Sequence, residues 1–469
     1  MKLPKISLKA LNFKRRDSSK NSTILSKNLG ESKKLNFKNR LKNIAKKTLK
    51  NCGISLLYAV IFSLPIYINI FSYSSIDIVN GKNGIFLPYI NAIFALISVF
   101  VALNIDKKYR FFFGFFVGIL WFYWMVLSFR YSHSSMSNFI AISVIIIGIV
   151  YGIVFYFLLF FNNKFWRVFT ISVIGYVAIL GFDWLVIESL FAFSVFRVDK
   201  ISFIFILLCI AIFSIMQSKK RIFALCALIF AIDFSYVDVK IPQNIFVSQM
   251  DVNQQVKWGE ETKIVAERNL GIIDDAIEKG YKMVILPETA FPFPLNRYIA
   301  MFDRLKEKSH SITIIAGSWF TENFESFNST YIFENGEVQI MKKTFLAPFG
   351  EYMPLPSFMA EIVSKITGFS FDTLAQSKDG LNDVNTEALK FRSAICYEAT
   401  KREIYKDNPK FMIVISNNAW FSPSIEPILQ MMIIKYYARL HKTLVIHTVN
   451  GTKSMIISPN TSLKFIADF

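Results

Sequence analysis

Long apolar runs alternate with short polar segments over the first half of the chain, and this pattern predicts a bundle of membrane helices. A helix needs roughly 20 apolar residues to cross the hydrocarbon core of a bilayer. Candidate runs cover residues 52–73, 84–104, 111–130, 138–161, 165–187, 200–217 and 221–236, of which the last two are the shortest. We therefore expect a polytopic α-helical bundle of about seven helices over residues 51–236.

The second half of the chain, residues 237–469, has a different pattern: short β-rich runs alternate with polar helical stretches. The β-rich runs cover residues 245–250, 283–286, 312–316, 331–333, 389–396, 412–416 and 444–448, and the helical stretches include 260–279 and 427–440. Such alternation indicates a layered α/β or α+β domain. Its 233 residues are enough for one domain with a sizeable core.

Residues 1–50 precede the apolar runs and are rich in Ser, Asn and Lys, which predicts a solvated, disordered arm. The arm holds 16 of the 53 lysines and arginines but only two of the 34 acidic residues, so it carries +14 of the net charge of +19. At 53% hydrophobic residues, the whole chain is too apolar for a soluble or disordered protein. We expect a cytoplasmic arm that orients the first membrane helix, with nucleic-acid binding as the alternative.

The charges of the loops predict the orientation of the bundle. With the arm inside, the inner loops carry eight basic residues and the outer loops carry only Lys82, Arg130, Arg197 and Lys200. This asymmetry follows the positive-inside rule and predicts that residues 237–469 lie outside the cytoplasm. Asp183, Glu188 and Asp233 lie near the ends of predicted spans, where an interfacial position is favoured over an ion path.

Cys396 is the single cysteine of residues 237–469 and follows a predicted strand. This domain can therefore form no internal disulfide and offers no cysteine-based zinc site. A buried structural cysteine is one interpretation, but the strand-end position beside Tyr397 and Glu398 favours a nucleophile. His441 and His447 lie in or beside the apolar run 440–448, which favours packing roles over a Cys–His pair.

A nucleophilic cysteine needs a base and a stabilising cation nearby. Glu288 comes after the predicted strand 283–286, and the segment 342–351 contains Lys342, Lys343 and Glu351. A carboxylate can accept the thiol proton, and an ammonium group can stabilise both a thiolate and an oxyanion. These residues are the candidate partners of the thiol.

Five blocks in this order resemble the nitrilase superfamily and, with the apolar bundle in front, its membrane-bound branch, the apolipoprotein N-acyltransferases. The blocks are Val247-Ser248-Gln249 through Lys257-Trp258-Gly259-Glu260, then Leu286-Pro287-Glu288-Thr289-Ala290, then Lys343 through Glu351-Tyr352-Met353-Pro354-Leu355, then Ala394-Ile395-Cys396-Tyr397-Glu398, then Ser416-Asn417-Asn418-Ala419-Trp420-Phe421. The pair Asn450-Gly451 also fits. The resemblance implies an α/β/β/α sandwich for residues 237–469.

The resemblance also implies roles for individual residues. Glu288 would be the general base, Lys343 the oxyanion stabiliser and Cys396 the nucleophile; the family spacing to Glu351 selects Lys343 over Lys342. Glu351 would support the active site, and Tyr397 and Glu398 would flank the nucleophile. Trp258 matches a tryptophan implicated in substrate binding, although an ordinary interfacial aromatic residue is an equally good interpretation.

The implied reaction moves an acyl chain from a membrane phospholipid, through a thioester on Cys396, to the α-amino group of the diacylglyceryl-cysteine of a bacterial apolipoprotein. The partners would be the phospholipid donor, the apolipoprotein acceptor and the bilayer, with no nucleic acid, metal or cofactor. The resemblance implies a monomer in the bacterial inner membrane, with its catalytic domain on the periplasmic side. The apolar segment 352–371 is expected to form a lid that dips into the outer leaflet, or else a packed helix and turn.

Two features depart from the family pattern. The family has a further membrane helix after the catalytic domain, whereas residues 452–469 contain no apolar span, and Val449 stands where the family often has a second asparagine. Two other functions remain open. A membrane-tethered amidase would have the same triad but would need only one helix as a tether. A transporter or sensor would leave the Glu288, Lys343 and Cys396 blocks unexplained.

Overall fold

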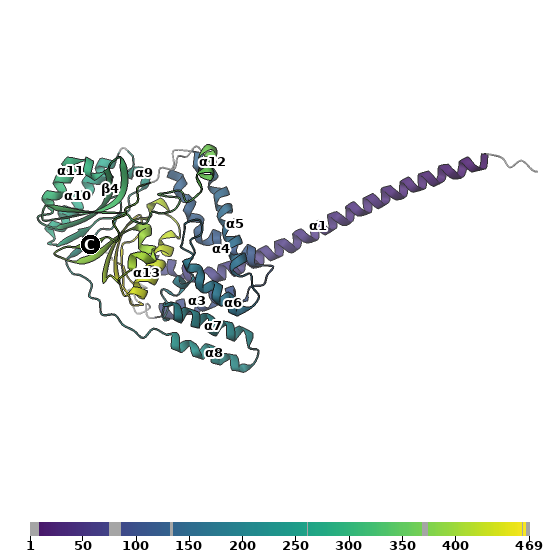
Figure 1. Ribbon diagram of the computed structural model, residues 1–469, viewed down its shortest axis with the longest axis horizontal. Coiled ribbons are helices and arrows are strands. Elements are labelled where there is room, and N and C mark those ends of the chain that lie inside the picture. Colours follow the sequence, from purple (N-terminus) through teal and green to yellow (C-terminus); the bar gives the residue numbers. More distant parts are fainter. Residues whose placement is uncertain are drawn as a thin grey trace, which may run out of the picture.

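The computed structural model describes residues 9–74, 86–131, 135–259, 261–367, 374–461 and 463–465. Of the positions discussed above, Lys82, Glu260 and residues 368–371 of the expected lid lie outside these ranges. The described chain forms a helical bundle beside a domain built on two β-sheets (Figure 1).

The bundle consists of helices that follow one another along the first half of the chain. They are α1 (Lys9–Ser74), α3 (Leu87–Asn104), α4 (Arg110–Phe122), α5 (Ile140–Leu158), α6 (Lys164–Val173), α7 (Lys200–Ile215) and α8 (Ile222–Cys226). Within the described ranges, four helical segments are long and apolar enough to cross a membrane: Lys38–Ile70, Leu87–Asn104, Arg110–Tyr131 and Ser137–Leu158. Four of the seven expected spans are thus long helices, and α7 is a shorter apolar helix.

The expected count of about seven spanning helices is not confirmed. The run 165–187 is not one helix, because α6 ends at Val173 and the chain continues in irregular segments and short 3₁₀ turns, η4 (Ile174–Tyr176) and η5 (Ile187–Phe191). The run 221–236 likewise divides into α8 and a 3₁₀ turn, η7 (Ala227–Ala231). Trp184 and Phe191 are 3% and 1% exposed inside the protein. Hydropathy measures transfer out of water and cannot separate a lipid environment from a protein interior.

Residues 9–50, for which the composition predicts a disordered arm, belong to helix α1. The first part of α1 projects from the bundle on the side away from the sheets (Figure 1). Lys, Leu and Ala favour helix, and no proline interrupts this stretch. The helix is continuous with the first membrane span, so its growth needs no separate nucleus.

The second half of the chain folds into two six-stranded sheets. The first sheet has the order β1 (Ile245–Val247), β2 (Met283–Ile285), β4 (Thr313–Glu322), β5 (Glu325–Glu334) and β6 (Glu337–Lys342), with β3 (Phe291–Pro294) paired to β4. The second has the order β12 (Leu463–Phe465), β11 (Met455–Ile457), β10 (Leu444–Asn450), β9 (Phe411–Asn417), β8 (Lys390–Ile395) and β7 (Asp383–Asn385). Each of the seven β-rich runs of the sequence overlaps one of these strands. Because β1, β2 and β4 are parallel, and β8, β9 and β10 are too, their carboxyl ends meet at shared edges.

The layers of this domain confirm the expected α/β/β/α sandwich. Side chains from both sheets, including Ile285, Ile315, Ile395 and Ile415, form a core between them. Helices α10 (Thr262–Glu278) and α11 (Ile299–Lys308) pack on the outer face of the first sheet. Helix α13 (Glu426–His441) packs on the second sheet and lies between that sheet and the bundle (Figure 1).

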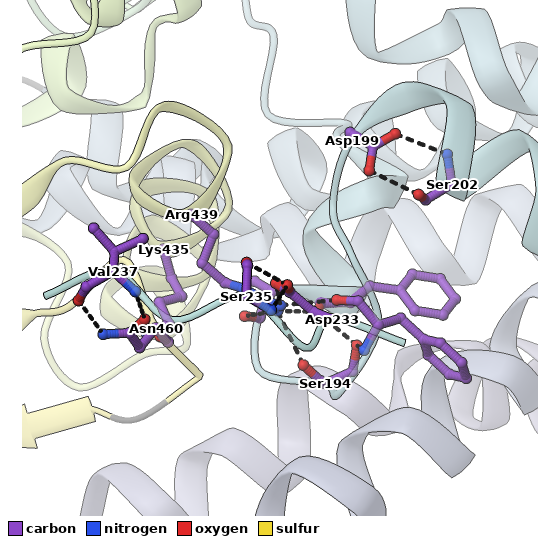
Figure 2. A network of polar contacts seen from close by, with 12 residues as sticks. Ser194, Asp199, Ser202, Asp233, Ser235, Val237, Lys435, Arg439 and Asn460 are labelled. Carbon is purple, nitrogen blue, oxygen red and sulfur yellow. Dashed lines mark hydrogen bonds and ion pairs between the residues drawn. The ribbon is translucent and has the colours of Figure 1, made fainter. Parts of the chain in front are cut away.

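Helix α13 is held to the bundle by a polar network (Figure 2). The guanidinium of Arg439 donates to the carbonyl oxygens of Ser194 (2.9 Å) and Phe196 (2.8 Å) and to Asp233 Oδ2 (2.8 Å). One turn earlier, Lys435 donates to the carbonyl oxygen of Ser458 at 2.8 Å. These bonds satisfy carbonyl groups of irregular chain inside the protein, and they fix the helix between the two halves of the molecule.

Candidate active site

Glu288 lies in a tight turn at the carboxyl end of β2. The next residue, Thr289, has a φ of +51°, and the turn rests on the backbone of β4 at Gly317. A Cβ atom at Gly317 would lie 2.6 Å from the Cα of Glu288, so only glycine fits there. The carboxylate is 7% exposed, and its Oε1 accepts a hydrogen bond from Asn328 Nδ2 at 2.7 Å. Burial raises the pKa of Glu288, and the charge of Lys343 only partly offsets this.

Lys343 follows β6 and is 1% exposed. Its Nζ lies 2.9 Å from Oε1 and 2.8 Å from Oε2 of Glu351. Burial alone would lower the pKa of Lys343, but the carboxylates of Glu351 and Glu288 outweigh burial and raise this pKa. The lysine is therefore a fixed cation. Lys342 is placed differently, because it pairs with Glu322 at 2.7 Å.

Asn328, in the middle of β5, joins the two carboxylates. Its Nδ2 donates to Glu288 Oε1 at 2.7 Å and to Glu351 Oε1 at 3.0 Å. Glu351 also accepts from the backbone N–H of Ala347 at 2.7 Å. Sequence reasoning missed Asn328. The available signal was a run of polar residues, 328–330, inside a strand whose neighbours are apolar.

Cys396 directly follows β8 (Lys390–Ile395) and is the first residue of the 3₁₀ turn η9 (Cys396–Thr400). Its φ of +52° is a left-handed conformation that costs a non-glycine residue about 1–3 kcal/mol and recurs at functional sites. Gln430 of α13 donates from Nε2 to Sγ at 3.7 Å. Burial and the charge of Glu288 raise the pKa of Cys396, while Lys343 lowers it less. The resting thiol is thus protonated and needs a base to become a nucleophile.

Glu398 ties the cysteine turn to the segment that carries Lys343. Its Oε1 accepts from the backbone N–H groups of Thr344 (2.6 Å) and Phe345 (3.0 Å), and its Oε2 accepts from Ile395 (2.8 Å). The side chain is fully buried, and burial raises the pKa of Glu398 to about 7. Glu398 therefore positions both segments.

Tyr397 connects the same turn to the bundle. Its hydroxyl donates to Asp183 Oδ1 at 2.5 Å, and its ring stacks on Phe182 and Trp184 with centroids 6.0 and 6.2 Å away. Lys401 Nζ lies 2.6 Å from Asp183 Oδ2. Asp183 thus contacts the residue that follows the candidate nucleophile.

The other acidic residues noted near the predicted spans are also paired. Glu188 pairs with Lys200, and Asp233 pairs with Arg439 at 2.8 Å. Each of these contacts joins a carboxylate to a single basic side chain.

Trp258 stands in a row of tryptophans beside the site. Its ring stacks on Trp319 at 4.9 Å and on Trp420 at 6.4 Å, and its Nε1 donates to Gln254 at 2.8 Å. Gln254 in turn donates to Asn417 at the end of β9 at 2.7 Å. Trp258 thus contacts two other tryptophans and is joined through Gln254 to the end of β9.

Neither histidine contacts Cys396. His447 is buried, bonds to Ser416 at 2.8 Å, and has its pKa lowered to about 3 by burial. His441 bonds to Asn408 at 2.8 Å. His441 and His447 therefore have packing roles, and neither forms a pair with Cys396.

Comparisons with known proteins identify the family of the chain. Residues 49–234 match the family model described as the apolipoprotein N-acyltransferase integral membrane domain. The apolipoprotein N-acyltransferase of Wolinella succinogenes is 36% identical over 413 residues, which cover 87% of this chain and 96% of that protein. The chain belongs to the apolipoprotein N-acyltransferase family. It is therefore an acyltransferase enzyme with an integral membrane domain.

Further relatives span the same regions. The apolipoprotein N-acyltransferase of Helicobacter hepaticus is 40% identical over 390 residues, covering 80% of this chain and 95% of that protein. That of Helicobacter pylori is 35% identical over 412 residues, covering 87% of this chain and 95% of the other. A solved carbon-nitrogen hydrolase from Helicobacter pylori G27 is similar over 47% of this chain and 82% of its own, with 13% identity and a TM-score of 0.34.

Proposed function

We propose that this member of the apolipoprotein N-acyltransferase family transfers an acyl chain from a membrane phospholipid to an apolipoprotein. The acceptor would be the α-amino group of the N-terminal diacylglyceryl-cysteine, and the intermediate a thioester on Cys396. The observation that carries the proposal is the grouping of Glu288, Lys343 and Cys396 at strand ends, linked by Asn328 and Glu351.

In the first half-reaction, Glu288 accepts the thiol proton of Cys396, and the sulfur attacks the ester carbonyl of the phospholipid. The ammonium of Lys343, fixed by Glu351, stabilises the oxyanion that forms. The carbon–oxygen bond breaks, the lysophospholipid alkoxide takes the proton from Glu288, and the acyl chain remains on sulfur.

In the second half-reaction, the neutral amine of the acceptor attacks the thioester carbonyl. Glu288 accepts a proton from the nitrogen, the carbon–sulfur bond breaks, and the thiolate of Cys396 takes that proton back. The product is an amide, which is more stable than a thioester, so the transfer proceeds toward the N-acylated lipoprotein.

We propose that the sandwich domain lies on the periplasmic side of the bacterial inner membrane. The basic residues of the inner loops and of residues 1–50 support this orientation, as does the position of the first part of α1, which projects away from the sheets. A cysteine introduced into residues 38–50 should then be protected from a membrane-impermeant thiol reagent in intact spheroplasts and should react after lysis.

Helix α12 (Ser357–Thr367) is proposed as part of the expected lid. Phe358, Met359, Ile362 and Ile366 are each more than 40% exposed, and such a row of apolar side chains suits an interfacial helix. Hydrogen exchange over 357–367 should differ between the protein in phospholipid nanodiscs and the protein in detergent without phospholipid. Uniform protection with and without phospholipid contradicts the lid.

The central test is the intact mass of the purified protein after incubation with phospholipid. We expect an increase equal to one acyl chain, absent in Cys396→Ser and present in the control Cys226→Ser, since Cys226 is an exposed cysteine of the bundle. A diacylglyceryl-cysteine peptide should release the adduct and appear as its N-acyl derivative.

Two outcomes contradict the proposal. One is the absence of an adduct on active, folded protein. The other is release of the adduct by water at the same rate with and without the peptide, which is the result expected of an amidase-like hydrolase.

A further inference from the structure

Helix α13 carries a buried acid that the two half-reactions above leave unused. Glu426 is its first residue and is 1% exposed. Among the described residues, its Oε2 has no hydrogen-bond partner. An ionisable side chain is rarely buried without a partner, because desolvation costs several kcal/mol, so the position calls for a functional explanation.

Glu426 lies on the side of α13 that faces the candidate nucleophile. Residues four apart share a face of a helix, and Gln430, one turn after Glu426, donates to Cys396 Sγ at 3.7 Å. The amide of Gln430 is itself oriented by Asn418, which donates to its Oε1 at 3.2 Å. The charge of Glu426 acts on Cys396, and the charge of Glu288 acts on Glu426. The charges of two carboxyl groups, Glu288 and Glu426, therefore act on the same sulfur.

The number of protons in the second half-reaction requires a second acceptor. An α-amino group has a pKa of about 8 in water, so at pH 7 about nine in ten acceptor molecules arrive as ammonium. Conversion of a thioester and an ammonium into an amide and a thiol removes two protons from nitrogen and returns only one to sulfur. Glu288 carries the proton that returns to sulfur, and the other proton still needs a base.

We propose that Glu426 is this second base and binds the ammonium group of the acceptor. The inference rests on the proposed function and adds one step to it. The Glu426 carboxylate accepts one proton from the ammonium, which leaves a neutral amine beside the thioester. The amine then forms its bond to the acyl carbon as described above, and Glu426 later gives its proton to solvent water.

The surroundings of Glu426 suit a base. Burial and the charge of Glu288 hold the pKa of Glu426 well above its usual range, which makes its carboxylate more basic than an exposed one. The segment before α13 is contacted from the bundle by Arg130, which donates to the carbonyl oxygen of Ser422 at 3.0 Å. Tyr123 of the bundle bonds to the backbone of Ile425. Neither of these groups neutralises the Glu426 carboxylate.

The test measures the two half-reactions separately in Glu426→Gln, with the full-length protein in phospholipid nanodiscs. Acyl-enzyme formation, followed by intact mass, should match the wild type. Transfer to a diacylglyceryl-cysteine peptide should be about tenfold slower at pH 7, because only the neutral tenth of the peptide reacts. At pH 9 most of the peptide is neutral, so the difference should shrink to less than about twofold.

Two variants make the result specific. Glu426→Asp keeps a carboxylate and should recover part of the transfer rate at pH 7. Glu403→Gln, at an exposed glutamate of η10 (Arg402–Tyr405), should behave as the wild type at both pH values. A structural defect in Glu426→Gln would lower the melting temperature and slow both half-reactions at every pH, which would overturn the inference.

The inference also fails if Glu426→Gln transfers at the wild-type rate at pH 7, or if its deficit is the same at pH 7 and pH 9. These results would leave the acyltransferase proposal intact, because acyl-enzyme formation would be unchanged. Absence of an acyl-enzyme in the wild type would instead overturn both.

Discussion

Replacing Asp183 by Asn tests whether the bundle positions the nucleophile. Asp183 accepts hydrogen bonds from the Tyr397 hydroxyl at 2.5 Å and from the Lys401 ammonium at 2.6 Å. Asparagine keeps the size of the side chain and one acceptor oxygen but removes the charge. A hydrogen bond to a charged group contributes about 1.5–3 kcal/mol, so the variant should weaken docking of η9 on the bundle by about 2 kcal/mol.

The expected loss of rate depends on the contacts that still hold η9 to the bundle in Asp183→Asn. Trp184 still donates to Thr400 at 2.7 Å, at the other end of η9, so the turn should stay docked in most molecules. We expect acyl-enzyme formation to slow by about tenfold, less than the roughly thirtyfold that 2 kcal/mol would give if no other contact held the turn. Rapid-quench intact-mass analysis with excess phospholipid measures this rate directly.

A matched control lies in the same segment of the bundle. Asp199 caps helix α7 by accepting from the backbone N–H of Ser202 at 2.9 Å and from its hydroxyl at 2.7 Å (Figure 2). Asparagine is an equally good capping residue, so Asp199→Asn should react at the wild-type rate. Wild-type kinetics in folded Asp183→Asn would refute the reasoning that the bundle holds η9 in place.

Three further predictions concern the sandwich domain. Gly317→Ala should push the Glu288 turn away from β4, lower the free energy of unfolding by about 2–3 kcal/mol and abolish the thioester. In the control Gly271→Ala on α10, the added Cβ meets no atom within 4 Å, and the free energy of unfolding should rise by up to about 1 kcal/mol. Thermal unfolding and intact mass distinguish the two variants. Glu351→Gln leaves the buried Lys343 cation without its counter-ion and should cost about 3–5 kcal/mol, measured as a fall in melting temperature. The pKa of His447 is lowered to about 3 in the folded protein, so the unfolded chain binds a proton first and the stability falls as the pH falls below 6.5. The free energy of unfolding should decrease by about 2 kcal/mol between pH 6.5 and 5. His447→Asn should flatten this pH dependence.

The sequence predicted the central strands and the edge strand β1, and it missed the other edges. The strands near the middle of each sheet are short β-rich runs whose side chains are buried, and such runs are easy to recognise. Strand β6 alternates exposed Glu337 and Gln339 with half-buried Val338 and Ile340, and β7 has only three residues, so neither forms a continuous apolar run. Their places depend on pairing with a neighbour that is already in the sheet.

Some residues of the candidate site could likewise be predicted from the sequence, and others could not. Glu288, Lys343 and Cys396 each stand next to a strand end, where local sequence and the family resemblance both indicate function. Asn328 lies inside a strand, where its one local signal is the polar run 328–330, and Gln430 lies inside a helix without such a signal. Their contacts with Glu288 and Cys396 bridge 40 and 34 positions of the chain, and only folding brings such residues together.

By itself, the sequence determined that the chain has an apolar bundle followed by a layered α/β domain, and which side chains could perform acyl transfer. The first follows from the hydropathy of each run, and the second from the residues at strand ends together with the resemblance to the nitrilase superfamily. The tertiary structure alone decided which apolar runs become long helices and which lie as irregular chain buried inside the protein. It also decided that Asp183 meets Tyr397 and that Glu426 faces Cys396, because burial, charge and contact depend on neighbours that are distant in sequence.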